Sequence, residues 1–499
     1  MTGPHGDKDK MKDTPDSTHI QANLQPGEAP GEAAKAIRDT LDGIAKKHES
    51  PKIERDDKTD IGNSERLLAL YRSRILYCAT WKQWLIWRGA RWAIDDSQEI
   101  RRLAKTTVQT MYYTAGNMDK DGQRQAFAAW IKRSESLGRL KAMIESAEDQ
   151  VPILPTDLDA NPLLFNVNNG TIHLDSGDFR GHSKADRITK IADVDYSTKA
   201  ECPQWMAFLT RIFDGNDEVI RYLQRCIGWA MTADVSEQVL FFLWGTGANG
   251  KSTLLAIILL IMGDYGCQMA PETILRKRSG GIPSDVARLH GKRFVATSET
   301  GEGHKLAEEL IKIFTGGDKV VARRLYQNEF EFSPTHKIFL STNHRPEIEG
   351  TDHAIWRRIR LIPFNITIPE DEQDRDLLWK LKQELSGILR WAVHGSVEWR
   401  NHGLGYPEEI RRATEAYREE MDVMGGFFED KCVFGEGKEA KSSALRLTYK
   451  DYCEANGEKA KTQKYVAARL KERDCKRNRR EDGYYWLGVG LKNEPLWGK

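Results

Sequence analysis

The chain has 499 residues, of which 39% are hydrophobic, and this length and composition fit about two to four globular domains. Its 75 lysines and arginines nearly balance its 74 aspartates and glutamates, so nucleic-acid binding has to come from local patches and not from bulk charge. We find neither a signal peptide nor an apolar run long enough to cross a membrane, which predicts a cytoplasmic protein with no membrane partner. The seven cysteines form no C-x-x-C pair, which favours reduced thiols and argues against a zinc site.

The N-terminal part is expected to hold a tail followed by an α+β domain. Residues 1–62 contain no aromatic side chain and are rich in charged residues, glycine and proline, so we expect this segment to be disordered. The domain over 63–235 opens with an amphipathic helix that is capped by Asn63 or Ser64. A hairpin over 84–92 turns at its central Arg-Gly pair. Its tryptophans either fill a small core, which is the interpretation we favour, or stack on unpaired bases.

Two further patterns complete this expected domain. Residues 163–184 alternate as short strands, with Asn169-Gly170 as the predicted hairpin turn. Residues 203–230 have helical periodicity and lead into the next domain.

The most informative stretch of the chain is a glycine-rich run between a predicted strand over 238–244 (QVLFFLW) and a predicted helix over 251–262 (KSTLLAIILLIM). It fits G-x-x-x-x-G-K-[S/T], in which backbone N–H groups and a helix N-terminus surround the phosphates of a nucleoside triphosphate. We expect Lys251 to reach the β- and γ-phosphates of ATP and the Ser252 hydroxyl to bind Mg²⁺. The residues of this predicted phosphate loop are Gly245, Thr246, Gly247, Ala248, Asn249, Gly250, Lys251, Ser252 and Thr253.

Polar residues follow the next predicted strands in an order that favours a catalytic site. A strand over 293–299 ends in Glu299, whose carboxylate would join the Mg²⁺ shell and polarise the attacking water. A later strand ends at Asn343, which would orient that water or touch the γ-phosphate. One of Arg357 and Arg358 would stabilise transition-state charge, in cis or from a neighbouring subunit. An ordinary surface glutamate and a solvated arginine pair are the alternatives.

These motifs together resemble superfamily 3 DNA helicases of the phage and plasmid primase-helicase type, the group that also contains the poxvirus primase-helicase. Besides the phosphate loop, the resemblance is carried by SET at 298–300, LIKIFTGGD at 310–318, FEF at 330–332, STN at 341–343 and DHAIWRRIRLIPF at 352–364. It implies an AAA+-like core assembled as a ring, usually a hexamer, with ATP between subunits. It also implies that Glu299 is the second-motif acid, that Asn343 is the sensor, and that Arg357 or Arg358 is the arginine finger.

One departure from the superfamily pattern concerns the acids. Many members carry two acids at the second motif, whereas Ser298 precedes Glu299 here. The metal-binding role and the base role therefore either both fall on Glu299 or are shared with another acid such as Asp318.

In this superfamily, a hairpin before the sensor strand grips one DNA strand in the ring channel. The matching segment here is 320–332. Because side chains alternate along a strand, one of Arg323 and Arg324 is expected to face the channel. The expected DNA contacts are Arg323, Arg324 and Tyr326, with Lys319, His336 and Lys337 as further candidates.

The C-terminal part is the most basic segment of the chain. Predicted helices over 442–455 and 462–473 precede a hairpin with Asp482-Gly483 at its tip, an order that resembles the winged helix often appended to this superfamily. Charge clustering favours duplex DNA as its partner over another protein. The predicted DNA contacts in this part are Lys464, Arg469, Arg479 and Arg480.

The predicted fold class is α/β, with an AAA+-like P-loop ATPase core, an N-terminal α+β domain and a C-terminal winged helix. The expected segments are a disordered tail, a helicase-associated domain, the ATPase core, a helical linker and the winged helix, over 1–62, 63–235, 236–400, 401–425 and 426–499.

We therefore expect an ATP-dependent replicative DNA helicase of phage, prophage or plasmid origin, which moves along single-stranded DNA as a ring and opens forked DNA. Its cofactors would be ATP and Mg²⁺, and its form a homo-oligomer, by resemblance a hexamer, in the bacterial host cytoplasm. Residues 1–62 are too short and too polar for a primase domain, so a separate primase or polymerase is an expected partner.

Two other functions remain as alternatives. One is a non-translocating DNA-binding AAA+ ATPase that acts as a replication initiator or switch. The other is a small-molecule P-loop kinase, which explains neither the Asn343–Arg358 series nor the basic C-terminal part.

Overall fold

The computed structural model describes residues 58–276, 284–298, 303–323, 329–348, 350, 353–458 and 460–492. By its internal contacts the chain divides into two compact units. The first holds the described residues up to Ile86 together with Ile94–Pro155, and the second holds Trp87–Ala93 and the described residues from Thr156 onward. Most of the expected tail lies outside the described residues.

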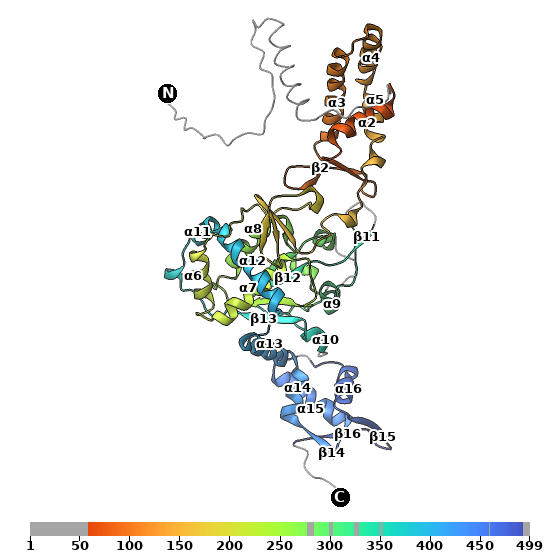
Figure 1. Ribbon diagram of the computed structural model, residues 1–499. Coiled ribbons are helices and arrows are strands. Elements are labelled where there is room, and N and C mark those ends of the chain that lie inside the picture. Colours follow the sequence, from red (N-terminus) through yellow and green to blue (C-terminus); the bar gives the residue numbers. More distant parts are fainter. Residues whose placement is uncertain are drawn as a thin grey trace, which may run out of the picture. The chain divides into compact units, whose positions relative to one another are not determined.

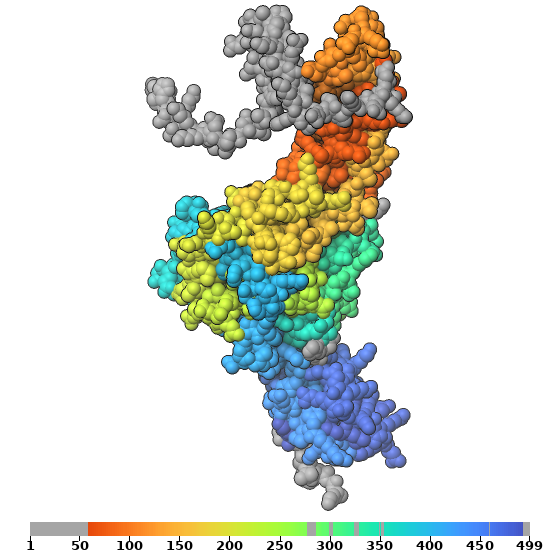
Figure 2. Space-filling model, viewed as in Figure 1, coloured from red at the N-terminus to blue at the C-terminus, as the bar shows by residue number. Residues whose placement is uncertain are grey.

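The first unit combines helices with a small sheet around its own core (Figure 1 and, in red to orange, Figure 2). Its apolar residues, among them Trp84 and Trp130, are buried in one cluster. Its elements are α2 (Asp60–Tyr71), β1 (Ile75–Cys78), β2 (Gln83–Trp87), α3 (Glu99–Gly116), α4 (Asp121–Ser134) and α5 (Leu137–Glu145). The short strand β3 (Trp92–Ile94) begins in the second unit and ends in the first.

The first helix starts earlier than the sequence pattern predicted. Thr59 is the N-cap of α2, and its hydroxyl accepts the N–H of Gly62 at 2.9 Å. The prediction that Asn63 or Ser64 caps this helix is therefore wrong. Asn63 is fully buried inside the helix, where its side-chain amide donates to Ser134 Oγ at 3.0 Å.

Two of the three hairpin tryptophans are buried, as we favoured, and the third, Trp87, is half-buried. Trp84 and Trp92 keep only 8% and 4% of their surface exposed. The Trp92 indole donates to the Lys184 carbonyl at 3.0 Å, which satisfies its one polar atom.

A parallel sheet is the centre of the second unit, and it confirms the α/β fold class. Its strand order is β13-β7-β12-β9-β8, and every pair in it is parallel. The strands are apolar on both faces because both faces are covered. Phe241 and Leu243 of β7 face one core cluster, whereas Leu240 and Phe242 face the other. The strands are β7 (Leu240–Trp244), β8 (Gly266–Gln268), β9 (Phe294–Ser298), β12 (Lys337–Thr342) and β13 (Ile359–Pro363).

Helices pack on both faces of this sheet (Figure 1). One core cluster joins the sheet to α6 (Pro203–Ile212), α7 (Asp217–Met231), α8 (Lys251–Met262), α11 (Leu377–Gln383) and α12 (Leu385–His402). The other joins it to α9 (Glu308–Gly316), the hairpin β10 (Val320–Arg323) and β11 (Glu329–Phe332), α10 (His353–Trp356) and α13 (Glu408–Met421).

The division of the chain falls earlier than the expected boundary at 235. The small sheet of β4 (Leu164–Val167), β5 (Gly170–His173) and β6 (Asp178–Arg180) precedes α6 and α7, and its buried residues share one cluster with the parallel sheet. The expected linker 401–425 likewise contains α13, whose Tyr417 is fully buried against the sheet.

Two predicted turns are displaced by one residue. Val167 pairs with Gly170, so the loop between β4 and β5 is Asn168-Asn169 and not Asn169-Gly170. A Cβ on Gly170 would lie 2.4 Å from the Arg180 carbonyl oxygen, so this glycine serves close strand packing. In the C-terminal hairpin, Gly483 is likewise the first paired residue of its strand.

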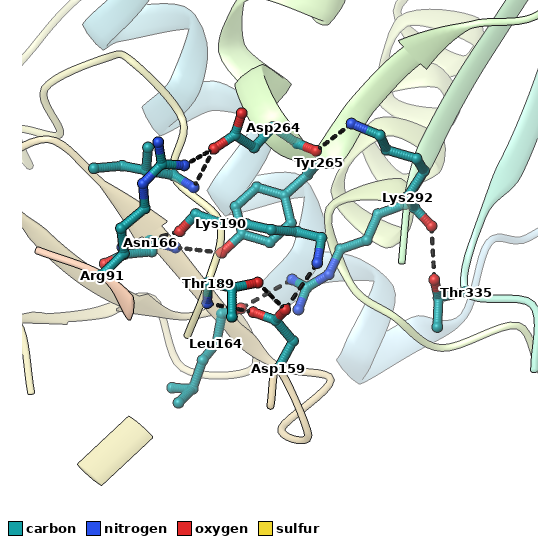
Figure 3. A network of polar contacts seen from close by, with 12 residues as sticks. Arg91, Asp159, Leu164, Asn166, Thr189, Lys190, Asp264, Tyr265, Lys292 and Thr335 are labelled. Carbon is teal, nitrogen blue, oxygen red and sulfur yellow. Dashed lines mark hydrogen bonds and ion pairs between the residues drawn. The ribbon is translucent and has the colours of Figure 1, made fainter. Parts of the chain in front are cut away.

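A polar network ties together the amino ends of β8, β9 and β12 (Figure 3). Lys292, just before β9, donates to the Asp264 carbonyl at 2.7 Å and accepts the Thr335 hydroxyl at 2.6 Å. The Asp264 carboxylate also binds Arg91, and Asp159 accepts the Lys190 ammonium at 2.8 Å. This network lies at the edge of the sheet opposite the phosphate loop, and it holds strands in place.

The C-terminal residues form a module with its own buried core, which contains Phe427, Tyr449 and Trp486. Its strands are ordered β14-β16-β15 and pair antiparallel. Its elements are α14 (Val423–Lys431), β14 (Cys432–Lys441), α15 (Ser442–Ala455), α16 (Gln463–Glu472), β15 (Lys476–Arg480) and β16 (Gly483–Leu491). Among the helices of the described residues, none is both long and apolar enough to span a bilayer.

Candidate nucleotide site

The predicted catalytic residues follow neighbouring strands of the parallel sheet. The glycine-rich loop follows β7, and Asn343 follows β12, whose last residue Thr342 pairs with Trp244 of β7. Ser298, the end of β9, pairs with Ser341 of β12. Since these strands are parallel, their carboxyl ends share one edge, which is where α/β proteins bind nucleotides. Glu299 lies outside the described residues.

Lys251 is the centre of this edge. Its side chain is 4% exposed, and its ammonium donates to three oxygens. These are the Gly245 carbonyl at 2.7 Å, the Asn249 Oδ1 at 2.9 Å and the Asn343 Oδ1 at 3.1 Å. The structure therefore brings together the predicted phosphate-binding lysine and the predicted sensor, which stand far apart in the sequence.

The loop conformation needs its glycines. Gly250 has φ +83°, in the left-handed region, and a Cβ there would lie 2.7 Å from Ile212 and 2.9 Å from Phe208. A Cβ on Gly245 would lie 2.3 Å from the Asn249 amide nitrogen. Asn249 is 3% exposed, so the loop is packed down onto α6 and its own side chains.

Burial lowers the pKa of Lys251 to about 8. The three acceptors around the ammonium are neutral oxygens, so nothing in these contacts offsets the loss of solvation. A bound polyanion would supply the counter-charge, which fits the triphosphate of ATP.

The remaining loop residues suit a phosphate and a metal. Thr246 and Ala248 are exposed, and Ser252 is exposed in the first turn of α8, with Thr253 half-buried beside it. A serine hydroxyl at the start of the helix is an oxygen ligand of the kind that Mg²⁺ prefers. Ser252 is thus the one expected Mg²⁺ ligand that the described residues include, and Mg²⁺ binding stays a prediction.

The two arginines have different surroundings. Arg357 is exposed, and its guanidinium donates to Gln238 Oε1 at 3.0 Å. Arg358 is 8% exposed and donates to Thr315 Oγ1 at 3.1 Å and to the Ala354 carbonyl at 2.5 Å. Arg357 therefore lies at the surface, whereas Arg358 is held inside the fold.

The hairpin before the sensor strand is confirmed as an antiparallel pair of β10 and β11. Arg323 is exposed at its end, and Lys319 contacts Glu331 at 3.4 Å on the surface. Arg324 and Tyr326 lie outside the described residues.

The further candidates His336 and Lys337 were wrong. They are 3% and 1% exposed, because His336 directly precedes the buried strand β12 and Lys337 is its first residue. The Lys337 ammonium donates to the Thr232 carbonyl at 2.5 Å and lies 5.1 Å from the Trp229 ring centre. Neither side chain can reach DNA.

The basic residues of the C-terminal module separate into exposed and ion-paired groups. Lys464 and Arg479 are exposed. Arg469 is half-buried and binds both Asp422 and Glu472, and Arg480 binds Glu439 through both guanidinium nitrogens at 2.6 and 2.9 Å. Their charges are thus neutralised within the module, which sequence counting could not reveal.

A groove in this module is lined by Lys464, which we had predicted as a DNA contact, and by four other cations that we had not predicted. It has a volume of about 570 Å³ and lies between α15, the start of α16 and β15. The clustering of basic residues in the sequence was the only sign that such a groove exists. The cationic residues that line it are Arg446, Lys450, Lys461, Lys464 and Arg477.

Trp244 is a second residue that the sequence analysis missed. Its indole N–H donates to the Asn343 carbonyl at 3.2 Å, so the last residue of β7 also holds the predicted sensor. Its place directly before Gly245 was the only sign of such a role.

Two known families match this chain, one in its N-terminal part and one over the candidate site. Residues 64–214 match the family described as D5 N terminal like. Residues 243–358, which include the phosphate loop, Asn343 and both arginines, match a family of unknown function, DUF5906.

Similar proteins come from large DNA viruses. The helicase-named protein L207/L206 of Acanthamoeba polyphaga mimivirus is 26% identical over 411 residues, which cover 73% of this chain and 42% of that protein. The helicase-named protein 022R of Frog virus 3 is 26% identical over 278 residues, covering 52% of this chain and 28% of that protein. The primase-named protein C962R of African swine fever virus is 23% identical over 362 residues, which cover 65% of this chain and 36% of that protein.

A solved structure of the NrS-1 C-terminal region covers 87% of this chain and 100% of that one, at 11% identity and a TM-score of 0.49. This likeness is too distant to bear on function. The chain spans between 28% and 42% of the length of the three viral relatives. The predicted likeness to primase-helicases is thus confirmed at the level of D5-like viral helicase and primase proteins, while superfamily 3 membership and a phage or plasmid origin stay predictions.

Proposed function

We propose that this chain is an ATP-driven DNA helicase of the replicative helicase-primase type, which moves along single-stranded DNA as a ring. The meeting of Lys251 and Asn343 carries the proposal, with Nζ 3.1 Å from Oδ1. A lysine that starts a helix after a glycine-rich turn and touches a polar residue on the neighbouring strand suits the γ-phosphate of a nucleotide. Similarity to helicase- and primase-named viral proteins supports DNA replication as the setting.

Each residue at the edge has a task in ATP hydrolysis. Lys251 exchanges its oxygen partners for the β- and γ-phosphates, and its charge stabilises the charge that builds up on the transferred group. Asn343 then orients the attacking water. Mg²⁺, when bound by Ser252 and Glu299, would neutralise phosphate charge.

The proposal places the ATP site between subunits, with Arg357 as the finger. Its exposure supports this choice, since a finger has to leave its own subunit. Arg358 suits it less well, because burial and two hydrogen bonds hold it in place. An arginine in this position stabilises transition-state charge.

Subunit mixing tests the shared site. The Lys251→Ala and Arg357→Ala variants should each be inactive alone. When they are mixed in equal amounts and allowed to exchange, a random ring has both wild-type residues at about one quarter of its sites, which predicts about a quarter of the wild-type ATPase rate. A mixture that stays inactive although mass analysis shows mixed rings would exclude a finger supplied in trans.

We assign the C-terminal module as a winged helix that binds duplex DNA through the groove. The order helix, strand, helix, helix and hairpin supports the fold assignment. Among the described residues that line the groove there are five cations and no carboxylate, which suits the phosphate backbone. The proposal retains Lys464 and Arg479 as contacts and replaces the ion-paired Arg469 and Arg480 with Lys461 and Arg477.

Salt dependence of DNA binding tests this surface. Each lost phosphate contact should reduce the slope of log K against log salt by about 0.9. We expect that reduction for Lys461→Ala and Arg477→Ala. Arg480→Ala, in the same hairpin, is the matched control because Glu439 already neutralises it. Equal effects of all three variants would refute the groove.

Strand displacement tests the function as a whole. Wild-type protein should unwind forked DNA with a single-stranded loading arm, and Lys251→Ala should not. Lys141→Ala, a surface change far from the loop in sequence, is the control. Changing Lys319, Arg323 and Arg324 together to alanine should reduce unwinding while ATPase activity persists. ATP hydrolysis without unwinding would instead favour the non-translocating initiator or switch.

Particle images test the ring. Protein mixed with a non-hydrolysable ATP analogue and single-stranded DNA should form closed rings with a central channel, and each ring is expected to be a hexamer. Monomers under these conditions would contradict a ring motor.

A further inference from the structure

Arg345 occupies an unusual position beside the proposed ATP site. It follows the sensor Asn343 by two residues, and its side chain is 21% exposed. Its guanidinium carbon lies 4.6 Å from the centre of the Trp244 ring and 5.5 Å from that of Tyr417. It also forms an ion pair with Glu420 of α13.

Trp244 connects this arginine to the sensor. Trp244 is the last residue of β7, directly before the phosphate loop, and its indole N–H donates to the Asn343 carbonyl at 3.2 Å. Stacking of Arg345 on the ring therefore restrains the group that holds the sensor's backbone. The sensor's side chain in turn accepts Lys251 at 3.1 Å.

Helix α13 contacts the segment that follows Asn343. The Tyr417 hydroxyl donates to the Pro346 carbonyl, and its ring is fully buried between Phe242 and Trp356. Tyr417 and Glu420 lie one turn apart on α13, so both hold the same short segment after Asn343.

Besides Trp244 and Lys251, a turn holds Asn343, in which Thr342 Oγ1 accepts the His344 N–H at 3.2 Å. Asn343 is exposed, and it lies past the end of β12, where no strand pairing holds it. A displacement of the water-orienting group by about 1 Å can slow an enzyme by about a hundredfold.

We propose that Arg345 is the positioning residue of the ATP site: by stacking on Trp244 and pairing with Glu420, it holds Asn343 against Lys251. This inference rests on the proposed ATPase function. Arg345 itself contacts none of the phosphate-loop residues in the hydrogen bonds of the described structure, so its effect passes through Trp244 and Asn343.

Steady-state ATPase kinetics give the first test. Arg345→Ala should lower kcat between about tenfold and a hundredfold while KM for ATP changes less than about threefold, since the loss is confined to the transition state. The Trp244→Phe variant keeps an aromatic ring under Arg345 but removes the indole N–H donor, so it should lower kcat in the same way. Adding Arg345→Ala to Asn343→Ala should cause little further loss, because both changes remove one shared effect.

Arg139 offers a matched control in the first unit. Its guanidinium carbon lies 4.4 Å from the Trp130 ring centre, and it pairs with Asp60 at 2.9 Å, so it makes the same two kinds of contact. Arg139→Ala should lower the unfolding temperature about as much as Arg345→Ala does and leave kcat unchanged. Equal kcat in the Arg345→Ala and Arg139→Ala variants would overturn the positioning role.

A crystal structure of the Arg345→Ala variant gives a second test that does not depend on ATP hydrolysis. We expect Asn343 Oδ1 to move out of hydrogen-bond distance of Lys251 Nζ. A distance unchanged from 3.1 Å would overturn the inference even if the wild-type protein hydrolyses ATP. If the wild-type protein shows no ATPase activity, the proposed function fails, and this distance still decides whether Arg345 positions Asn343.

Discussion

Raising the pH from 7.5 to 9.0 should weaken ATP binding to this protein by about eightfold. Burial lowers the pKa of Lys251 to about 8 in the free protein. A bound triphosphate would restore it to at least the ordinary lysine value of about 10.4. Because the free form loses its proton first, affinity is complete below pH 8 and is lost as the pH rises through 8 towards 10.4.

The magnitude follows from these two pKa values. Between pH 7.5 and 9.0, the protonated fraction of Lys251 falls much more in the free protein than in the complex. The resulting loss of affinity is about eightfold, or about 1.2 kcal/mol. Titration with a fluorescent, non-hydrolysable ATP analogue in buffers of constant ionic strength measures it.

Lys251→Arg is the control, because a guanidinium keeps its charge over this range. Its affinity should therefore not change between the two pH values, whatever its absolute affinity. If the wild-type affinity changes less than twofold, the ammonium of Lys251 does not carry the phosphate interaction. If the arginine variant shows the wild-type slope, another group is titrating.

Three predictions concern stability. Burial lowers the pKa of His336 to about 3, whereas the unfolded histidine has a pKa of about 6.5. The free energy of unfolding should therefore be complete above pH 6.5 and should fall below it, by about 2 kcal/mol at pH 5. Urea unfolding of the His336→Phe variant should lack this fall, and an equal fall in the variant would contradict the prediction. Gly228→Ala should destabilise by at least about 3 kcal/mol, since its Cβ would lie 2.0 Å from an α12 backbone nitrogen. Gly138→Ala, with open space around it, should be neutral or stabilising, and similar melting temperatures for both variants would refute the packing argument. Asp159→Asn leaves Lys190 without its ion pair and should lower the free energy of unfolding by about 3 kcal/mol, most of it regained by adding Lys190→Met; no regain would mean that the pair itself is not the cause.

The parts of the site that were predictable depend on local sequence. The phosphate-loop helix runs over Lys251–Met262, as expected, because a glycine-rich turn and an apolar run define its two ends. The strands before the loop and before Asn343 were recognised from their apolar runs, since strands covered on both faces need no alternation. The α15 helix also begins and ends at the expected residues.

The errors arise where a long-range contact outweighs a local preference. Asn63 is a good capping residue, yet a partner in α4 holds it inside the helix. Gly170 suits a turn, yet the neighbouring strand needs its small size. Arg358 and Arg469 are cations in the sequence, but their partners, distant along the chain, remove them from the surface.

By itself, the sequence determined that the protein has an α/β unit, and it predicted nucleotide binding there, because the spacing of the glycine-rich run and the polar strand ends is a property of the chain alone. Only the tertiary structure decided which residues share the site. Strand order places Asn343 and Trp244 against Lys251, and α13 places Tyr417 and Glu420 around Arg345. The physical reason is that charge and hydrogen bonding depend on distance and burial, which strand pairing sets between residues far apart in the sequence.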